Sequence, residues 1–516
     1  MKSALLKYYP LLALLLLCGF YLFKAIDFPA NDFANYYFGG KFLAKGNFSS
    51  NIYFPYEFNK AIFDSGYPNI FVSYAPNTPF LAFSFLLFAG FSLAVAKIIF
   101  NSLSVVLFFF SIYRLFNHYK IDWRYALLIP VLFLVPIKNN LLFGQVYFLL
   151  FFLLSEGWLA YEKKQWKSMS LFWSLAILLK VFPVLLVALF IFRKQWKPLS
   201  FWVAFCLLLL GISILFTGVD IWIFYLQEVL PKASNGEIAT GFVDNYQSVF
   251  MFLKRCFVFE TIENPNAFYN YPNLFSALMV AFKIGVLVIG YFISKRNSNT
   301  LFVFSYWILA MILLSPYGST YTFILLLFPF LALLKSEISN TKKVAFCLII
   351  FLINNFSLSI FIGQEFPFSY LRMLLLFLFF VLFLLQFRQK VNWKAVAMLS
   401  LFPLFLILFF KTTKPEKSTI LLENGPTLVY DYEINNNSLI GHFWDGREKV
   451  ILWNTKIQTF HPLKLKNNQV FYNNQQLTFD KSHKRKPILI DNKTVLYLSD
   501  YDRGIGFYTL RKITLN

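Results

Sequence analysis

The sequence predicts an all-α protein with many membrane-spanning helices, followed by a small β-rich domain outside the membrane. Of its 516 residues, 58% are hydrophobic and 14% are charged, whereas soluble domains are about 45–50% apolar and about 25% charged. Apolar runs of about 20 residues, enough to cross roughly 30 Å of hydrocarbon, recur up to residue 410. Short β-prone runs separated by Asn, Gly and Asp then fill residues 411–516. We therefore expect two domains, 1–410 and 411–516.

The net charge of +22 does not indicate a nucleic-acid-binding protein. The Lys and Arg residues form short clusters between apolar runs, as cytoplasmic loops of membrane proteins do, and no basic stripe or docking motif is present. The four cysteines are scattered and show neither a disulfide framework nor metal-ligand spacing.

The basic clusters predict a topology that starts in the cytoplasm. Lys2 and Lys7 precede the apolar run 8–25, which lacks a small-residue cleavage site and is therefore expected to stay as the first helix. The run 78–93 is short for a span, and we expect it to be re-entrant or interfacial. Two long polar stretches are expected to be external loops: 26–77 and 219–272.

The remaining apolar runs bring the expected number of spans to about 13. They are 98–116, 125–137, 141–161, 168–192, 199–218, 273–293, 300–316, 320–334, 344–362, 369–387 and 395–410. Basic clusters flank 168–192 at both ends, so a single span would put them on opposite sides of the membrane. A hairpin with Lys180 and Pro183 near its tip keeps both clusters inside, and we favour it. We then expect the β-rich tail to be extracytoplasmic; its role stays open, and packing or partner docking is favoured.

Ionisable groups near a membrane boundary are candidates for chemistry. The first external loop holds four acids and several tyrosines: Asp27, Asp32, Glu57, Asp64, Tyr36, Tyr37, Tyr53, Tyr56 and Tyr74. The second holds Asp220, Glu228, Glu237, Asp244, Asn245, Gln247, Ser248, Lys254 and Arg255. No Ser/His/Asp set or Gly-rich phosphate loop is evident, and the four histidines are spaced too irregularly for a metal site.

Several motifs occur in an order that matches a known family. The first loop contains DFANYYFGGKFLAKGNFSSNIY, with an acid, an aromatic pair, a Gly and a Tyr. The later elements are Tyr74-Ala75-Pro76, Gly144-Gln145, Lys180 with Pro183, NYQSVFMFLKR and Ser315-Pro316. Together they resemble the polyprenol-phosphate-dependent GT-C glycosyltransferases over residues 27 to about 335, and most closely glycosyltransferase family 87. Two features depart from that pattern: Tyr317 and Tyr321 stand where the family often has Trp and His, and the β-rich tail has no counterpart.

The resemblance implies a multi-pass enzyme of the bacterial inner membrane. It would move a hexose, mannose in most of the family, from a polyprenyl-phosphate donor to a hydroxyl of a lipid, glycan or protein on the extracytoplasmic face, with inversion. Asp32 would be the general base, and Lys180 and Arg255 would face the donor phosphate. The cleft residues would be Tyr36, Tyr37, Tyr53, Tyr74, Gln145, Asn245, Gln247 and Ser248. We expect no cofactor, and no carboxylate cage for a metal is visible.

Simpler roles stay open for these residues. They are helix capping for Asp32, an interfacial belt for Tyr36 and Tyr37, helix packing for Gly144-Gln145, snorkelling for Lys180, a topological or lipid-contacting charge for Arg255, and loop hydrogen bonding for Asn245 and Gln247. Two other functions are possible. A transporter would be expected to show internal duplication, which we do not see. A polymerase or ligase using lipid pyrophosphate would place a basic loop late, whereas here an acidic loop comes first.

Overall fold

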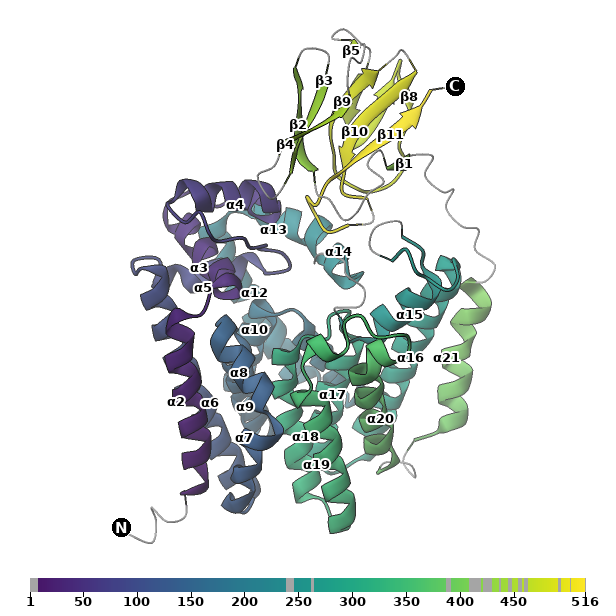
Figure 1. Ribbon diagram of the computed structural model, residues 1–516. Coiled ribbons are helices and arrows are strands. Elements are labelled where there is room, and N and C mark those ends of the chain that lie inside the picture. The colour runs from purple at the N-terminus through teal and green to yellow at the C-terminus, as the bar shows by residue number, and fades with distance from the viewer. Residues whose placement is uncertain are drawn as a thin grey trace.

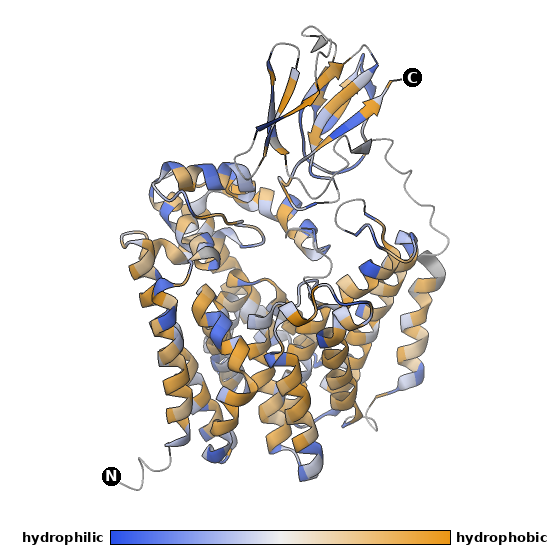
Figure 2. Ribbon diagram, in the orientation of Figure 1, coloured by the Kyte–Doolittle hydropathy of each residue, from blue (hydrophilic) through white to orange (hydrophobic). Residues whose placement is uncertain are grey.

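The chain forms a helical body with a β domain at one end (Figure 1). The computed structural model describes residues 8–237, 246–260, 264–386, 391–407, 419–420, 429–435, 438–443, 448–452, 457–458, 463–490, 493–501 and 503–515. The helices of the body are hydrophobic along most of their length (Figure 2), as membrane-embedded helices require. This confirms the predicted helical membrane protein with a C-terminal β domain.

The predicted number of about 13 spans is not confirmed. In the described part of the chain, five helices are long and apolar enough to cross a membrane: α2 (Pro10–Asp27), α6 (Leu93–Tyr119), α12 (Trp196–Thr217), α16 (Pro272–Arg296) and Phe368–Leu385, which contains α20 (Leu371–Leu385). A pair bent by 66°, Trp123–Leu132 with Leu134–Phe143, makes a possible sixth. The other apolar runs form helices of 10–17 residues. At 1.5 Å per residue these helices fall short of roughly 30 Å of hydrocarbon.

Shorter elements complete the body. The two stretches predicted as external loops, 26–77 and 219–272, contain α3 (Asn31–Ala44), η1 (Ser50–Tyr53), α4 (Pro55–Asp64), α13 (Val219–Phe224), η5 (Tyr225–Val229), α14 (Leu230–Ser234) and α15 (Val249–Phe257). The helices α5 (Pro79–Phe85) and η2 (Leu86–Phe88) follow the first stretch. The others are η3 (Trp123–Leu127), α7 (Leu128–Leu132), α8 (Leu134–Phe143), α9 (Tyr147–Glu162), α10 (Trp166–Leu179), η4 (Phe182–Leu186), α11 (Val187–Phe192), α17 (Thr300–Leu314), η7 (Thr320–Leu326), α18 (Leu327–Lys335), α19 (Asn340–Asn355), η8 (Leu358–Ile360), η9 (Phe368–Tyr370) and α21 (Trp393–Ile407).

The segment 166–192 folds back on itself. Tyr161, just before α10, donates a hydrogen bond to Gln195 Oε1 at 2.7 Å and accepts one from Arg193 Nη1 at 3.1 Å. Both ends of the segment therefore lie together, and Lys180 lies at the break between α10 and η4. The predicted hairpin is confirmed.

Two adjacent glycines let α5 pack closely on α3. A Cβ at Gly40 would lie 2.6 Å from the Phe85 backbone, and one at Gly39 would lie 2.5 Å from the Tyr74 ring. The expected short element at 78–93 is thus a pair of short helices, α5 and η2, resting on the first-loop helix rather than a span.

The β domain is a central sheet covered on both faces. Its strands are β1 (Thr419–Ile420), β2 (Val429–Asn435), β3 (Ser438–Phe443), β4 (Glu448–Leu452), β5 (Ile457–Gln458), β6 (Leu463–Lys466), β7 (Gln469–Tyr472), β8 (Gln475–Gln476), β9 (Lys484–Ile490), β10 (Thr494–Ser499) and β11 (Thr509–Thr514). The central sheet has the order β1-β11-β10-β9-β5. Alternation along β10 sends Leu496 and Leu498 to the core shared with β2 and β3, and Val495 and Tyr497 to the core shared with β7.

Candidate functional site

Asp32 lies in the first turn of α3, where Gln145 holds its carboxylate. Gln145 Nε2 donates to Asp32 Oδ2 at 2.6 Å, and the Tyr36 hydroxyl donates to Gln145 Oε1 at 2.7 Å. Tyr36 follows Asp32 by one helical turn, so both side chains lie on the same face of α3. The bond from Tyr36 fixes the amide oxygen, and this turns the amide NH₂ toward the carboxylate. Ala30 occupies the N-cap position of α3 without a side-chain cap, so Asp32 is not the capping residue.

A glycine brings Gln145 close to α3. Gly144 ends α8 in the left-handed region, with φ of +67°, and a Cβ there would lie 2.7 Å from Phe33 Cβ. The Gln145 backbone N–H closes the turn on Asn140 O at 2.8 Å. The Gly-Gln pair therefore serves close packing, as considered from the sequence, and presents the Gln145 amide to Asp32.

Lys180 reaches the same cluster from the tip of the hairpin. Its Nζ donates to Asn77 Oδ1 at 3.0 Å and lies 5.7 Å from the centre of the Tyr36 ring. The Tyr53 hydroxyl donates to Asn77 O at 2.9 Å, and the Thr78 hydroxyl donates to Leu178 O. These bonds fix the segment before α5 to the end of α10. Lys180 is thus held inside the protein rather than snorkelling to the headgroups.

Burial and nearby charge shift the pKa of Asp32 in opposite directions. Burial raises the pKa of Asp32 above the usual range of a carboxyl, and the hydrogen bond from Gln145 and the charge of Lys180 offset only part of this rise. Tyr147 of α9 and Tyr321 of η7, whose rings lie 5.1 Å apart, are also within the electrostatic range of Asp32. A carboxylate, a cation and several hydroxyls therefore converge at one place.

The other predicted tyrosines build the scaffold. Tyr37 donates to Phe91 O at 2.8 Å and accepts from Lys41 at 2.9 Å, and Tyr74 donates to Thr78 O at 2.9 Å. Tyr36, Tyr37, Tyr53 and Tyr74 are all buried within the protein. The interfacial belt considered for Tyr36 and Tyr37 is therefore wrong.

The predicted residues of the second loop lie against the late Ser-Pro element. Ser248 caps α15 through Met251 N–H at 3.1 Å and donates to Pro316 O at 2.7 Å. Gln247 donates to Ser369 O at 2.7 Å, and a Cβ at Gly318 would lie 2.1 Å from Gln247 O. Asn245 lies outside the described residues.

Arg255 is held by the loop that follows it. It donates to Asn264 Oδ1 at 3.2 Å and to Asn266 O, and its guanidinium lies 5.6 Å from the centre of the Phe268 ring. Figure 1 shows α15 on the opposite side of the body from α3 and α4. The structure brings Asp32, Tyr36, Gln145 and Lys180 together and places Arg255 elsewhere.

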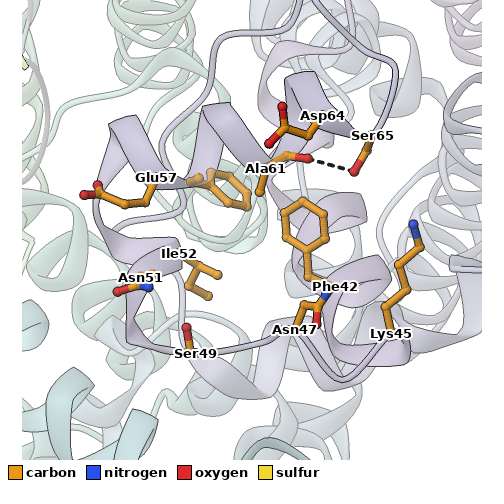
Figure 3. Close-up of a pocket in the computed structure, with 11 residues that line it drawn as sticks. Phe42, Lys45, Asn47, Ser49, Asn51, Ile52, Glu57, Ala61, Asp64 and Ser65 are labelled. Carbon is orange, nitrogen blue, oxygen red and sulfur yellow. Dashed lines mark hydrogen bonds between the residues drawn. The ribbon is translucent and has the colours of Figure 1, made fainter.

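A surface pocket of about 360 Å³ lies at the other end of α3 (Figure 3). Polar and apolar side chains both line it: Lys45, Asn47, Ser49, Asn51, Glu57, Asp64, Phe42 and Phe58. Phe42 follows Asp32 by ten residues, or about 15 Å along a helix, so this pocket is separate from the Asp32 cluster. Among the described residues, no group of three or more His, Cys, Asp or Glu could hold a metal ion.

Sequence reasoning missed Asn77, and it noted Tyr321 only as a departure from the family pattern. Asn77 directly follows Tyr74-Ala75-Pro76, which was the one available signal, but its partner Lys180 is 103 residues away. Tyr321 reaches the site because Asn140 donates to its carbonyl at 3.0 Å and Asn139 donates to Thr320 at 2.9 Å. These two bonds tie the start of η7 to α8.

Comparison with known proteins matches part of the chain to one family model. The sequence model of glycosyltransferase family 87 matches residues 75–316, a range that contains Gln145, Lys180 and Arg255. This match confirms the resemblance drawn from the motifs, although Asp32 and residues 26–74 of the first loop precede it. No curated protein and no solved structure gave a significant match.

Proposed function

We propose that this chain is a membrane glycosyltransferase that transfers a hexose from a polyprenyl-phosphate donor to an acceptor hydroxyl with inversion. Its match to the model of glycosyltransferase family 87 over residues 75–316 supports this proposal. The observation that carries the proposal is the Asp32 carboxylate, which Gln145 holds at 2.6 Å beside the charge of Lys180. Mannose is the hexose that the family resemblance favours. The enzyme would lie in a bacterial inner membrane with its N-terminus in the cytoplasm. The Asp32 loop and the β domain, which contact each other, would face outward.

Asp32 is the general base in this mechanism. A hydroxyl is a weak nucleophile, so a carboxylate within hydrogen-bond reach takes its proton as attack begins. Gln145 occupies Oδ2 and leaves Oδ1 for the acceptor O–H. A pKa above the usual carboxyl range makes Asp32 a better proton acceptor than an exposed aspartate.

The bond changes follow a single displacement. The acceptor oxygen forms a bond to the anomeric carbon, while the bond from that carbon to the donor phosphate oxygen breaks. The electron pair of the broken bond leaves with the phosphate, and the acceptor proton passes to Asp32. The sugar is transferred without a covalent enzyme intermediate, and its configuration inverts.

Lys180 binds the charged phosphate of the donor and keeps this contact as the phosphate leaves. Its ammonium group acts as a point charge, and Asn77 holds it in place before the donor binds. Arg255 remains a predicted second cation on the strength of the family resemblance, because its described partners belong to its own loop. Tyr36 positions Gln145, and the other buried tyrosines fix the segments that carry the reacting groups.

The proposal is tested in proteoliposomes that contain the purified protein, labelled polyprenyl-phosphate mannose and a membrane extract as the acceptor source. We expect label in an acceptor product whose anomeric configuration is opposite to that of the donor, measured by NMR. Empty liposomes and a nucleotide-mannose donor are the controls. Transfer from the nucleotide sugar alone, or retention of configuration, would overturn the proposal.

A further inference from the structure

The β domain is attached to the external helices through a buried charged cluster. Asp500, which follows β10, is completely buried and accepts hydrogen bonds from the backbone N–H groups of His483 at 2.7 Å and Gly506 at 2.9 Å. Lys232 of α14 lies 3.5 Å from the same carboxylate. Breaking a buried pair leaves an uncompensated charge, so this contact strongly favours the attached position.

His483 stands between the β domain and both external loops. Its Nδ1 lies 3.1 Å from Asp500 Oδ2, and its Nε2 lies 3.8 Å from Glu228 of η5. Its ring meets Phe54 edge to face, with 5.2 Å between the centroids and 81° between the planes. One side chain of the β domain thus contacts both the first and the second loop.

Neighbouring contacts reinforce this attachment. Arg485 of β9 pairs with Glu57 of α4 at 2.5 Å and lies 5.6 Å from the centre of the Phe54 ring. Ile505 is 1% exposed and belongs to the hydrophobic core of the helical body. Figure 1 shows the β domain over α4, α13 and α14, which agrees with these contacts.

The attachment point is linked to the Asp32 cluster by a short series of contacts. Phe54 directly follows Tyr53, the last residue of η1. Tyr53 donates to Asn77 O at 2.9 Å, and Asn77 Oδ1 accepts the bond from Lys180 at 3.0 Å. The rings of Phe224 and Tyr225 in the second loop lie 5.8 and 6.1 Å from the Tyr53 ring.

We infer that the β domain is a positioning element of the transfer site, with His483 seating Phe54 so that Tyr53 and Asn77 hold Lys180 toward the donor phosphate. The inference rests on the proposed role of Lys180 in donor binding. It gives the β domain a function in the reaction: removing the contact between His483 and Phe54 weakens donor binding and leaves the transfer step largely unchanged. His483 acts through other residues and touches no substrate.

The test compares donor KM and kcat for His483→Ala, His483→Phe and the wild type in the full-length protein. Loss of one aromatic contact should raise the donor KM of His483→Ala roughly two- to tenfold, with kcat unchanged within about twofold. His483→Phe keeps a ring against Phe54 and should restore much of the donor KM. His442→Ala is the matched control, because His442 lies on β3 and pairs there with Glu433 and Glu448. Phe54→Leu makes the same test from the membrane side if His483→Ala does not accumulate.

The outcomes separate this inference from the proposed function. If Lys180→Met raises the donor KM while His483→Ala and Phe54→Leu leave it at the wild-type value, the positioning role is wrong and the proposed function stands. If Lys180→Met itself leaves the donor KM unchanged, the phosphate role of Lys180 fails and the positioning role fails with it.

Discussion

Replacing Gln145 with Glu puts a second carboxylate against the proposed base without changing the shape of the site. Gln145 Nε2 lies 2.6 Å from Asp32 Oδ2, and Tyr36 still donates to the other oxygen of the new residue. Two charges about 4 Å apart at an effective dielectric constant of about 20 repel by about 4 kcal/mol. At 1.36 kcal/mol per pKa unit this is an upward shift of about 3 units, so the two carboxylates share one proton near neutral pH.

The sign of the effect on activity follows from the role of Asp32. A base must be deprotonated, so the wild-type rate falls as the pH falls through the raised pKa of Asp32. In Gln145→Glu this acid limb should move to higher pH by about 3 units, and activity lost at pH 7 should return toward higher pH. The assay measures initial rates of label transfer across pH 5–10.

The matched control is Gln195→Glu, at the base of the 166–192 hairpin. Gln195 Oε1 also accepts a hydrogen bond from a tyrosine hydroxyl, that of Tyr161, at 2.7 Å. That variant makes the same chemical change away from Asp32 and should keep the wild-type pH profile. If the acid limb of Gln145→Glu coincides with that of the wild type, Asp32 does not supply the titrating base and the reasoning is refuted.

Three further predictions concern the scaffold. Tyr36→Phe frees the Gln145 amide to rotate, so kcat should fall roughly fivefold, the equivalent of one hydrogen bond of about 1 kcal/mol, in the transfer assay. Gly40→Ala places a Cβ 2.6 Å from the Phe85 backbone and should destabilise the protein by about 1–3 kcal/mol in thermal unfolding, whereas Gly90→Ala, with nothing within 4 Å of its Cβ, should not. Although burial opposes it, the charge of Lys232 and the bonds from His483 and Gly506 hold the pKa of Asp500 below its usual range. Its stabilisation is present above about pH 4 and is lost as the pH falls through the lowered pKa. Asp500→Asn should therefore lower the Tm at pH 7, and the gap from the wild type should shrink below pH 4.

The local sequence patterns predicted which helices and strands form better than they predicted how long each one is. The short β-prone runs between Asn, Gly and Asp turns identified the strands of the tail, but not that the central sheet would be covered on both faces. The basic clusters around 168–192 predicted a hairpin, which the Tyr161–Gln195 bond confirms. Hydropathy predicted about 13 spans, whereas five helices of the described chain, or six with the bent pair, are long and apolar enough to cross a membrane. An apolar run does not reveal where its helix breaks, as at the 66° bend between Leu132 and Leu134.

For the candidate site too, part of the arrangement could be predicted from the sequence and part could not. Motif order brought Asp32, Gln145 and Lys180 into one group, and the structure places them in contact or in electrostatic range. Asn77 was missed because its importance lies in a bond to Lys180 across 103 residues. Arg255 was grouped with them by the resemblance, whereas its bonds to Asn264 and Asn266 hold it in its own loop. Pairings of this kind depend on tertiary packing and leave little trace in local sequence.

The most direct test of the central claim is the initial rate of label transfer by Asp32→Asn at saturating donor and at equal membrane insertion. Asn has about the same size as Asp, but its side chain cannot take the proton from the substrate hydroxyl. Loss of a general base should lower kcat by a factor on the order of 10²–10⁴ while the donor KM stays within about twofold. Asp64→Asn, an exposed acid on the same loop, should transfer at the wild-type rate. If Asp32→Asn transfers label as fast as the wild type, Asp32 is not the base.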